Sequence, residues 1–203
     1  MNILIACEES QVECIAFRNR GHNAFSCDIQ NCSGGHPEWH IKRDVLEILN
    51  PINEKISFTT CTGVSYEISR WDMIIAHPPC TYLSVVGACN IKKDPTRIEK
   101  GFAAAEFFKK FLQADCERIC VENPRPQARF KLPPKSQVVS PYQFGEAWSK
   151  RTYLWLKGLP PLFCTLFVID YKSFVACKFG SKARSKSFKG IAEAMAQQWG
   201  SYL

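Results

Sequence analysis

The sequence contains little that would place it in a membrane or an oxidising compartment. Its longest apolar runs, such as Met73 to Ala76, are far too short to span a bilayer. The N-terminus has no basic segment leading into a long hydrophobic one, so we expect no secretory signal. Eleven cysteines are present, but they form no CxxC pair, and a disulfide framework is not expected. These absences predict a cytoplasmic protein without membrane partners.

The composition is that of a folded chain with polyanionic partners. The chain has 203 residues, of which 46% are hydrophobic and 12% aromatic, which is enough apolar material to bury one good core. We therefore expect a single domain over residues 1–203. The formal net charge of +7 favours a polyanion such as DNA, although charge of this size does not specify a fold.

Strand and helix patterns alternate along the chain, which predicts an α/β protein with helices on both faces of a Rossmann-like sheet. Asn2 to Cys7 is apolar enough for a buried strand, and a helix closed by Gly21 leads to a second strand that ends at Asp28. Alternating residues around Thr62 and Gly63 predict an inserted hairpin. Further strands are expected within 71–76, 118–124 and 151–156, and helices within 94–115 and 187–200. The helix of 94–115 should bury a face of Ile98, Phe102, Ala105, Phe108 and Leu112.

The first strand and helix lack the glycine fingerprint of dinucleotide sites, because the turn between them reads "CEESQ". Two glutamates would repel a pyrophosphate, whereas they would suit a ligand that carries positive charge. S-adenosylmethionine, with its sulfonium and ammonium groups, is such a ligand. The alternative is that Glu8 and Glu9 are merely solvated acids at a helix start, where negative charge is favoured.

Two motifs carry the chemistry. "HPPC" ends the strand that starts near Trp71, and its paired prolines stop that strand and hold Cys80 in a rigid loop. "VENP" ends another strand and places Glu122. Because ligands of open α/β sheets lie at the carboxyl ends of strands, Glu8, Asp28, Cys80 and Glu122 should share one edge. A thiolate and an acid beside a nucleotide-like site suit covalent addition to an electron-poor ring.

The ordered set "CDI", "RDVLEI", "HPPC", "VENP" and "SKRTYLW" resembles the DNA cytosine-5 methyltransferase family, and most closely its short phage- and prophage-associated proteins. The resemblance implies that Cys80 attacks C6 of cytosine, that Glu122 contacts N3 and the exocyclic amine, and that Arg151 holds the adduct. It also implies that Asp28 binds the ribose and Asp44 the adenine amine of S-adenosylmethionine. The full sets expected are, for the cofactor, Cys7, Glu8, Ser10, Asp28, Ile29, Asp44, Val45, His77 and Pro78, and for the substrate, Pro79, Asn123, Lys150 and Arg125.

The sequence departs from this family in two places. The Phe-x-Gly-x-Gly of the cofactor loop is "ACEESQ" here, and the target-recognition region is reduced to residues 157–184. We therefore expect methyl transfer to C5 of cytosine in DNA with reduced sequence selectivity, or with recognition supplied by a second subunit or partner. One alternative is an enzyme that modifies the pyrimidine C5 of a free nucleotide such as dCMP. Another is a catalytically inactive module that binds S-adenosylmethionine or nucleic acid.

Other candidate features are less specific. Cys32, His36 and His40 are spaced like metal ligands but lack an evident fourth ligand, so no metal site is predicted. The proline-rich, basic stretch from Pro124 to Ser149 is expected to be a functional surface loop. Together with Lys150 and the basic run of 181–189, it could contact phosphates or simply be a solvated basic face.

Overall fold

The computed structural model describes residues 1–174 and 186–201. Its strands are β1 (Asn2–Ala6), β2 (Asn23–Asp28), β3 (His40–Lys42), β4 (Ile56–Thr59), β5 (Ser65–Ile68), β6 (Met73–Ala76), β7 (Ile119–Pro124), β8 (Gln137–Val139), β9 (Trp148–Ser149), β10 (Thr152–Lys157) and β11 (Lys172–Ser173). The helices are α1 (Val12–Arg18), α2 (Arg97–Leu112) and α4 (Lys189–Gly200), and short 3-10 helices cover Pro37–Trp39, Val45–Glu47, Val85–Lys92, Ala128–Phe130 and Pro141–Gln143.

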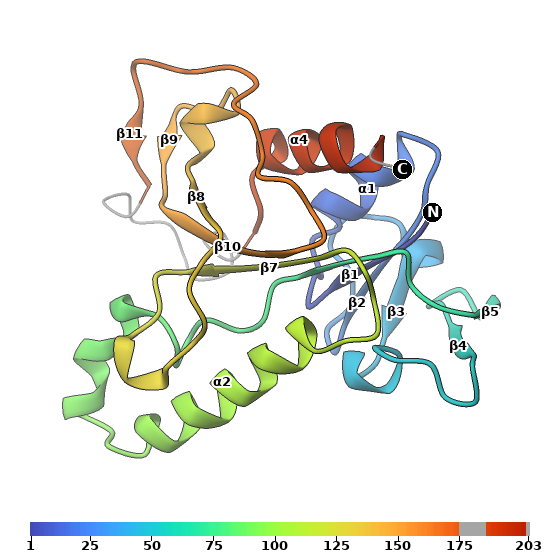
Figure 1. Ribbon diagram of the computed structural model, residues 1–203, viewed down its shortest axis with the longest axis horizontal. Coiled ribbons are helices and arrows are strands. Elements are labelled where there is room, and N and C mark those ends of the chain that lie inside the picture. Colours follow the sequence, from blue (N-terminus) through green and yellow to red (C-terminus); the bar gives the residue numbers. More distant parts are fainter. Residues whose placement is uncertain (175–185, 202–203) are drawn as a thin grey trace.

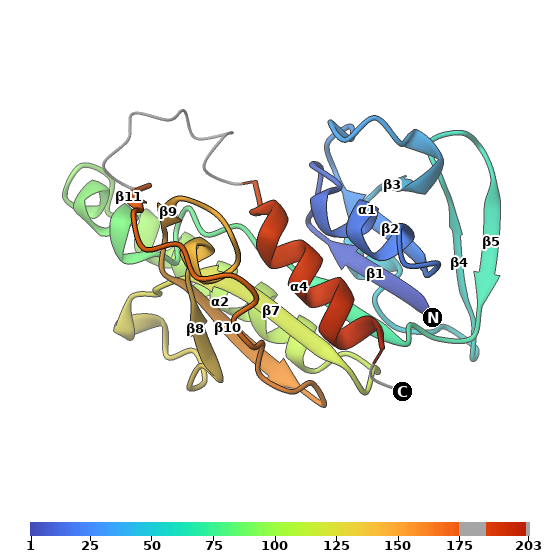
Figure 2. The same ribbon diagram turned by 90° about the horizontal axis from the view of Figure 1, so that it is seen from above.

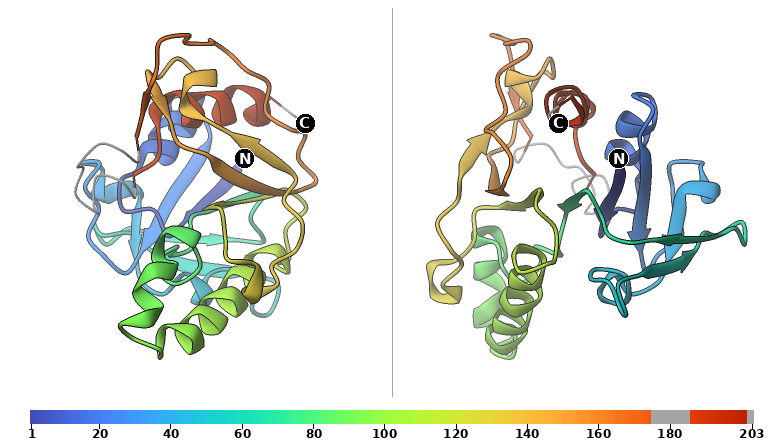
Figure 3. Two further views of the ribbon diagram at one scale, coloured as in Figure 1. Left: turned by 90° about the vertical axis from the view of Figure 1, so that its left-hand side faces the viewer. Right: turned by 45° about the vertical axis from the view of Figure 1, so that its right-hand side comes forward.

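A mostly parallel sheet of seven strands forms the centre, in the order β3-β2-β1-β6-β7-β10-β8. The five strands from β3 to β7 are parallel, whereas β10 is antiparallel to both of its neighbours. Figures 1 and 3 show α1 and α4 on one face of this sheet and α2 on the other. The α/β class and the Rossmann-like arrangement of the sheet follow the prediction, including helices on both faces.

The strand order reverses between β1 and β6. From β1 the chain moves outward to β2 and β3, and it returns to the other side of β1 as β6. The loops that leave the carboxyl ends of β1 and β6 therefore diverge, and such a switch point leaves a crevice at the sheet edge. The loop that begins at Cys7 follows β1, and the His-Pro-Pro-Cys loop follows β6, so the topology brings these two segments together.

The alternation of β1 divides the core into two clusters. Leu4 and Ala6 pack with α2 on one face, whereas Ile3 and Ile5 pack with α1 and α4 on the other. Successive strand residues point to opposite faces, and both faces are covered here, so all four side chains are completely buried. This explains why β1 is a continuous apolar run rather than an alternating one.

The predicted hairpin is present as β4 and β5, which pair antiparallel as a separate two-stranded sheet. Figure 2 shows it beside β3, at the opposite end of the molecule from β8, β9 and β11. Phe58 of β4 and Tyr66 of β5 pack around Phe25 of β2 with ring centroids 4.8–4.9 Å apart. The hairpin thus covers one end of the sheet.

Two expectations about local structure were wrong. The stretch from Pro124 to Ser149 is only partly a loop, because β8 lies within it and pairs with β10 as the sheet edge. The buried face of α2 consists of Gly101, Ala105, Phe108 and Phe111, while Phe102 is 49% exposed. The reason is a tertiary contact: the buried ring of Phe130 packs against α2 at Gly101, where only a glycine leaves room for it.

Within residues 1–174 and 186–201, no helix is long and apolar enough to cross a membrane.

The contact between Gly101 and Phe130 generates a stability prediction. Replacing a helix-interior glycine by alanine normally stabilises by roughly 0.5–1 kcal/mol, but a Cβ at residue 101 would overlap the Phe130 ring. We expect Gly101→Ala to lower the free energy of unfolding by about 1–3 kcal/mol through overpacking. Denaturant unfolding measures this change in free energy. The variant Ala103→Gly, on the exposed face of α2, measures the effect of helix propensity alone. A gain in stability for Gly101→Ala would contradict the packing described.

Candidate active site

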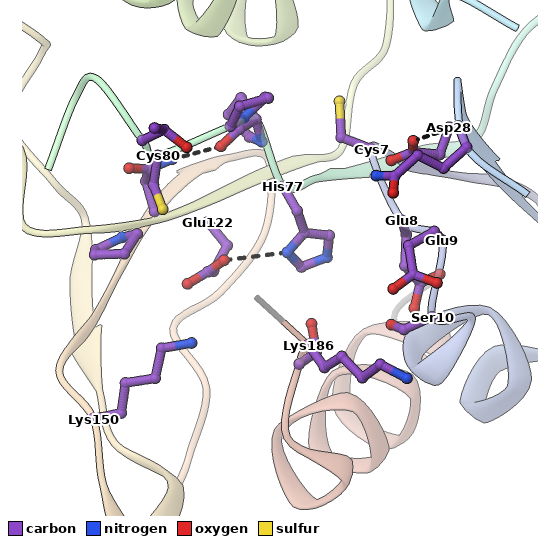
Figure 4. A pocket seen from close by; sticks show the side chains of 17 residues that line it. Cys7, Glu8, Glu9, Ser10, Asp28, His77, Cys80, Glu122, Lys150 and Lys186 are labelled. Carbon is purple, nitrogen blue, oxygen red and sulfur yellow. Dashed lines mark hydrogen bonds and ion pairs between the residues drawn. The ribbon is translucent and has the colours of Figure 1, made fainter. Parts of the chain in front are cut away.

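A cavity of about 300 Å³ lies at the switch point, beside the carboxyl ends of β1, β2, β6 and β7. Figure 4 shows its walls: Cys80 and Glu122 lie on one side of His77, and Glu8, Glu9, Ser10 and Asp28 lie on the other. We call this space the switch-point cavity. The predicted site residues that line it are Cys7, Glu8, Ser10, Asp28, His77, Pro78, Pro79, Cys80, Glu122, Asn123 and Lys150.

Five predicted residues do not line the cavity. Val45 is buried in the core, Ile29 is 72% exposed, and the Asp44 carboxylate accepts a hydrogen bond from the backbone N–H of Leu46 at a 3-10 helix start. Arg125 and Arg151 are exposed outside it. The neighbours of Arg151, Lys150 and Thr152, face this region. Alternate residues of an extended backbone face opposite sides, so Arg151 faces away from it.

The loop after β1 turns sharply without glycine. Cys7 and Gln11 both adopt left-handed backbone conformations, with φ of 59° and 61°. Non-glycine residues rarely occupy this region, and those that do cluster at ligand sites. The buried Gln11 side chain fixes the turn by hydrogen bonds with the backbone of His36 at 2.8 and 3.0 Å. The sharp turn that the missing glycine fingerprint would have provided is therefore formed by other residues.

The two glutamates of this loop have different surroundings. Glu8 is buried, and its carboxylate accepts hydrogen bonds from the backbone N–H groups of Glu13 and Cys14 at 2.9 and 3.4 Å, at the start of α1. Glu9 also lines the cavity, and its buried Oε2 has no hydrogen-bond partner among the described residues. Glu8 thus accepts hydrogen bonds from the start of α1, but it is buried and not solvated as the alternative interpretation held, while Glu9 retains an unsatisfied acceptor.

Hydrogen bonds from several elements fix the His-Pro-Pro-Cys loop. The backbone N–H of His77 donates to Ala6 in β1 at 2.9 Å, and the Asn123 side chain donates to the Pro78 carbonyl at 2.8 Å. The Cys80 carbonyl accepts from the backbone N–H groups of Leu83 and Ser84. Because each proline lacks an N–H donor, these outside contacts position the half-buried Cys80 next to Glu122 (Figure 4).

A line of buried charged groups runs under the cavity. His77 Nδ1 lies 3.2 Å from Glu122 Oε2, in a hydrogen bond, and His77 Nε2 lies 3.4 Å from Glu13 Oε1, an ion-pair contact without hydrogen-bond geometry. The His77 side chain is 10% exposed, and that of Glu13 is 1% exposed. Three elements contribute: α1 supplies Glu13, the loop after β6 supplies His77, and β7 supplies Glu122.

The pKa values of the pair follow from this burial and these partners. Burial alone would lower the pKa of His77, but the carboxylates of Glu13 and Glu122 outweigh it and raise the pKa above its ordinary value. Burial alone would raise the pKa of Glu122, yet the hydrogen bond from His77 and the charge of Lys150 lower it. Both shifts favour an imidazolium beside a carboxylate in the resting site.

Glu8 has the opposite tendency. Its pKa is raised by burial and then by the charge of Glu13, because two carboxylates in one buried place resist ionising together. Glu8 therefore tends to hold a proton.

The two cysteines at the cavity are not equivalent. Burial raises the pKa of Cys7, and the charge of Asp28 raises it further, so this thiol resists forming the nucleophilic thiolate. Cys80 lies on the other side of His77 from Asp28, the side on which Glu122 also lies (Figure 4). Cys80 is therefore the better candidate nucleophile of the two.

The histidines considered as metal ligands have other partners. His40 is buried, with Nδ1 2.9 Å from the Ser26 hydroxyl and Nε2 2.9 Å from the Gln30 carbonyl. His36 stacks on Trp39 with ring centroids 4.0 Å apart, and its Nδ1 lies 3.0 Å from Glu38. In the part of the chain that the structure describes, no group of three or more metal-ligating side chains is found. Most of the basic run of 181–189 lies outside the described residues.

Sequence reasoning missed three charged residues of this site. Glu9 was considered only together with Glu8, Glu13 was assigned only to the first helix, and Lys186, which lines the cavity, was one charge in a basic run. The signal available for Glu13 was an acid inside a short amphipathic helix, on the face that has to pack against the sheet.

Comparisons of the chain with protein-family models and with curated protein sequences give no match.

His77 generates a prediction about stability. Because its pKa in the fold is raised above the ordinary 6.5, its stabilising contribution is fully present below the unfolded pKa and is lost as pH rises through the folded pKa. The difference in unfolding free energy between wild type and His77→Gln should therefore shrink as pH rises above the ordinary pKa of 6.5 and through the raised pKa of the folded state.

The control for this measurement is His22→Gln. Burial lowers the pKa of His22, so the difference for this variant should change with the opposite sign, wild type gaining relative stability as pH rises. A pH-independent difference for His77→Gln would contradict the charge assignment of the site.

Proposed function

We propose that the protein transfers a methyl group from S-adenosylmethionine to C5 of cytosine in DNA, through a covalent adduct between Cys80 and C6. One observation carries the proposal: Cys80 and Glu122, which come from loops and strands 42 residues apart in sequence, line one cavity at the switch point. Such a cavity is the usual ligand site of an open α/β sheet. The resemblance of the "HPPC", "VENP" and "SKRTYLW" segments to the cytosine-5 methyltransferases supports the same assignment.

The side chains at the ends of β1 and β2 fit S-adenosylmethionine. Asp28 and Glu9 make this wall of the cavity acidic, which suits the sulfonium and ammonium charges and the ribose hydroxyls. The buried Glu9 Oε2 has no partner among the described residues, and a buried acceptor of this kind is normally satisfied by a ligand or water. Bound here, S-adenosylmethionine supplies an electrophilic methyl group.

Cys80 and Glu122 would then act on different atoms of the base. Carbon 5 of cytosine is a poor nucleophile until a group adds at C6, and the Cys80 thiolate is the group placed to add. Glu122, also at the cavity, would hold N3 and the exocyclic amine and so accommodate the charge that develops on the ring. The buried Asn123 amide acts indirectly, since it holds the Pro78 carbonyl and thus the loop that carries Cys80.

The substrate has to bring its base into a cavity, so a base in duplex DNA must be flipped out of the stack. Lys150 and Lys186 both line the cavity and could bind the phosphate next to that base, whereas the exposed Arg125 and Arg151 are placed to contact more distant phosphates. A phosphate site this close to the base would also serve a free nucleotide such as dCMP, which is the second candidate substrate.

The nucleophile can be tested by trapping. DNA that contains 5-fluorocytosine should form a covalent complex with the wild type in the presence of S-adenosylmethionine, because the fluorine at C5 cannot leave as a proton would. Cys80→Ser should abolish the complex, while Cys89→Ser, at an exposed cysteine away from the cavity, should leave it intact. A gel shift detects the covalent complex, and peptide mass spectrometry identifies the crosslinked residue. A crosslink that maps to a cysteine other than Cys80 would refute the assignment.

The cofactor can be tested by calorimetry. Asp28→Asn should weaken the binding of S-adenosylmethionine by roughly 1.5–3 kcal/mol, the value of a hydrogen bond to a charged group. Asp94→Asn is a matched control, because Asp94 is an aspartate outside the cavity whose side chain accepts hydrogen bonds from Thr96. Equal binding by the two variants, or no binding by the wild type, would count against the cofactor site.

A further inference from the structure

The His77 ring is held between two carboxylates, one at each ring nitrogen. Glu122 Oε2 is 3.2 Å from Nδ1, and Glu13 Oε1 is 3.4 Å from Nε2. Neutral imidazole has only one N–H group and would turn a lone pair towards one of these carboxylates, whereas imidazolium presents an N–H to both. Nδ1 is in a hydrogen bond and Nε2 is in an ion-pair contact without hydrogen-bond geometry, and a carboxylate at each ring nitrogen favours a positively charged ring.

Glu13 has no role in the reaction as described so far. It is 1% exposed and does not line the switch-point cavity, so it is not placed to contact a base or a cofactor there. A buried carboxylate is costly unless it is paired, and the side chains that interact with Glu13 at the site are those of His77 and Glu8. Glu13 Oε1 lies 3.4 Å from Nε2, the ring nitrogen that Glu122 does not contact, where a negative charge would favour the second proton of His77.

Glu122 needs a proton that the resting site does not leave on it. Adding a thiolate to C6 pushes an electron pair to N3, and N3 then requires a proton from the acid that contacts it. In the resting site, however, the hydrogen bond from His77 and the charge of Lys150 keep Glu122 ionised. The nearest proton that can move to it lies on His77 Nδ1.

We propose that His77, held as the imidazolium by Glu13, supplies the proton that Glu122 passes to N3 of cytosine. This inference rests on the proposed function and adds a positioning pair, Glu13 and His77, to the residues that contact the base.

The adduct forms by the shift of three electron pairs. The Cys80 thiolate pair forms the S–C6 bond, the C5=C6 π pair moves to C4–C5, and the C4=N3 π pair moves to N3. N3 takes a proton from Glu122, which takes one from His77 Nδ1, and the imidazole keeps its Nε2 proton towards Glu13. The C4–C5 π pair would then form the bond from C5 to the methyl carbon, the methyl–sulfur pair would stay on the departing S-adenosylhomocysteine, and the N3 pair would re-form C4=N3. The C5 proton leaves to solvent, its pair re-forms C5=C6, and the S–C6 pair returns to Cys80. The N3 proton returns through Glu122 to His77.

The charged groups that face His77 come from three elements. Glu13 on α1 and Glu122 on β7 favour its protonation, and Lys150, which precedes β10, opposes it. Glu8 faces Glu13 rather than the ring. Removing the charge of Glu13 should therefore make His77 lose its proton at a lower pH, and the rate of adduct formation should begin to fall at a lower pH in parallel.

The test is the pH dependence of adduct formation between the purified protein and 5-fluorocytosine DNA in the presence of S-adenosylmethionine. For Glu13→Gln, the rate of adduct formation should begin to decrease at a lower pH than it does for the wild type. His77→Gln should remove that fall and slow the reaction at neutral pH by about 100-fold, the usual size of a general-acid contribution. Glu38→Gln is the matched control, because it removes the carboxylate of another histidine–glutamate pair, His36 and Glu38, outside the cavity.

The possible results distinguish a failure of this inference from a failure of the proposed function. An alkaline fall that is unchanged in Glu13→Gln, or a His77→Gln variant that reacts like the wild type, overturns this inference and leaves the proposed function standing. Absence of any adduct with the wild type contradicts both. Should Glu13→Gln not fold, NMR titration of the His77 ring in the wild type, assigned with His77→Gln, decides the inference. A pKa above the ordinary value supports it, and one at or below that value overturns it.

Discussion

The reversal of strand order between β1 and β6 is the constraint on which the site depends. Parallel neighbours must be joined by crossovers, and where two crossovers leave in opposite directions the sheet edge is left open. The loops that begin at Cys7 and His77 flank that opening, and β7, next to β6, brings Glu122 to the same edge. The cavity therefore follows from the topology, and the paired prolines of the β6 loop refine it.

The buried charges at this edge are arranged so that opposite signs alternate. Glu13, His77, Glu122 and Lys150 follow one another as acid, base, acid and base. An isolated buried charge costs several kcal/mol, whereas an alternating row offsets much of that cost through its own interactions. A change of charge at one member of such a row alters the pKa of the next. The proposed proton supply would therefore use the same contacts that pair the buried charges.

The fold was largely predictable because its signals are local. Continuous apolar runs marked β1 and β6, the alternation around Gly63 marked the hairpin, and Asp28 was placed correctly at the end of β2. Tertiary contacts explain what was missed: Phe130 packs against α2 at Gly101, while Phe102 meets the Phe130 ring edge-on and stays half exposed. In addition, β8 is only three residues long. A short edge strand is specified by the neighbouring strand with which it pairs, so no local sequence pattern predicts it.

The candidate site was predictable to the extent that motifs follow strands. Cys80, Glu122, Asp28 and Lys150 line the cavity because each lies at or just beyond the end of a strand. Asp44 and Arg151 were assigned by resemblance. The Asp44 side chain caps a 3-10 helix instead, and backbone geometry places Arg151 away from the cavity. The contact between Glu13 and His77 joins residues 64 positions apart, so only the packing of α1 against the sheet reveals it.

The central claim is that this cavity methylates cytosine at C5. The most direct measurement incubates the purified protein with isotopically labelled S-adenosylmethionine and, in parallel, duplex DNA, single-stranded DNA and dCMP, followed by mass spectrometry of the nucleosides. The account predicts labelled 5-methylcytosine from DNA. Label in 5-methyl-dCMP alone would transfer the same chemistry to a free nucleotide, and the absence of label from all three substrates would contradict the account.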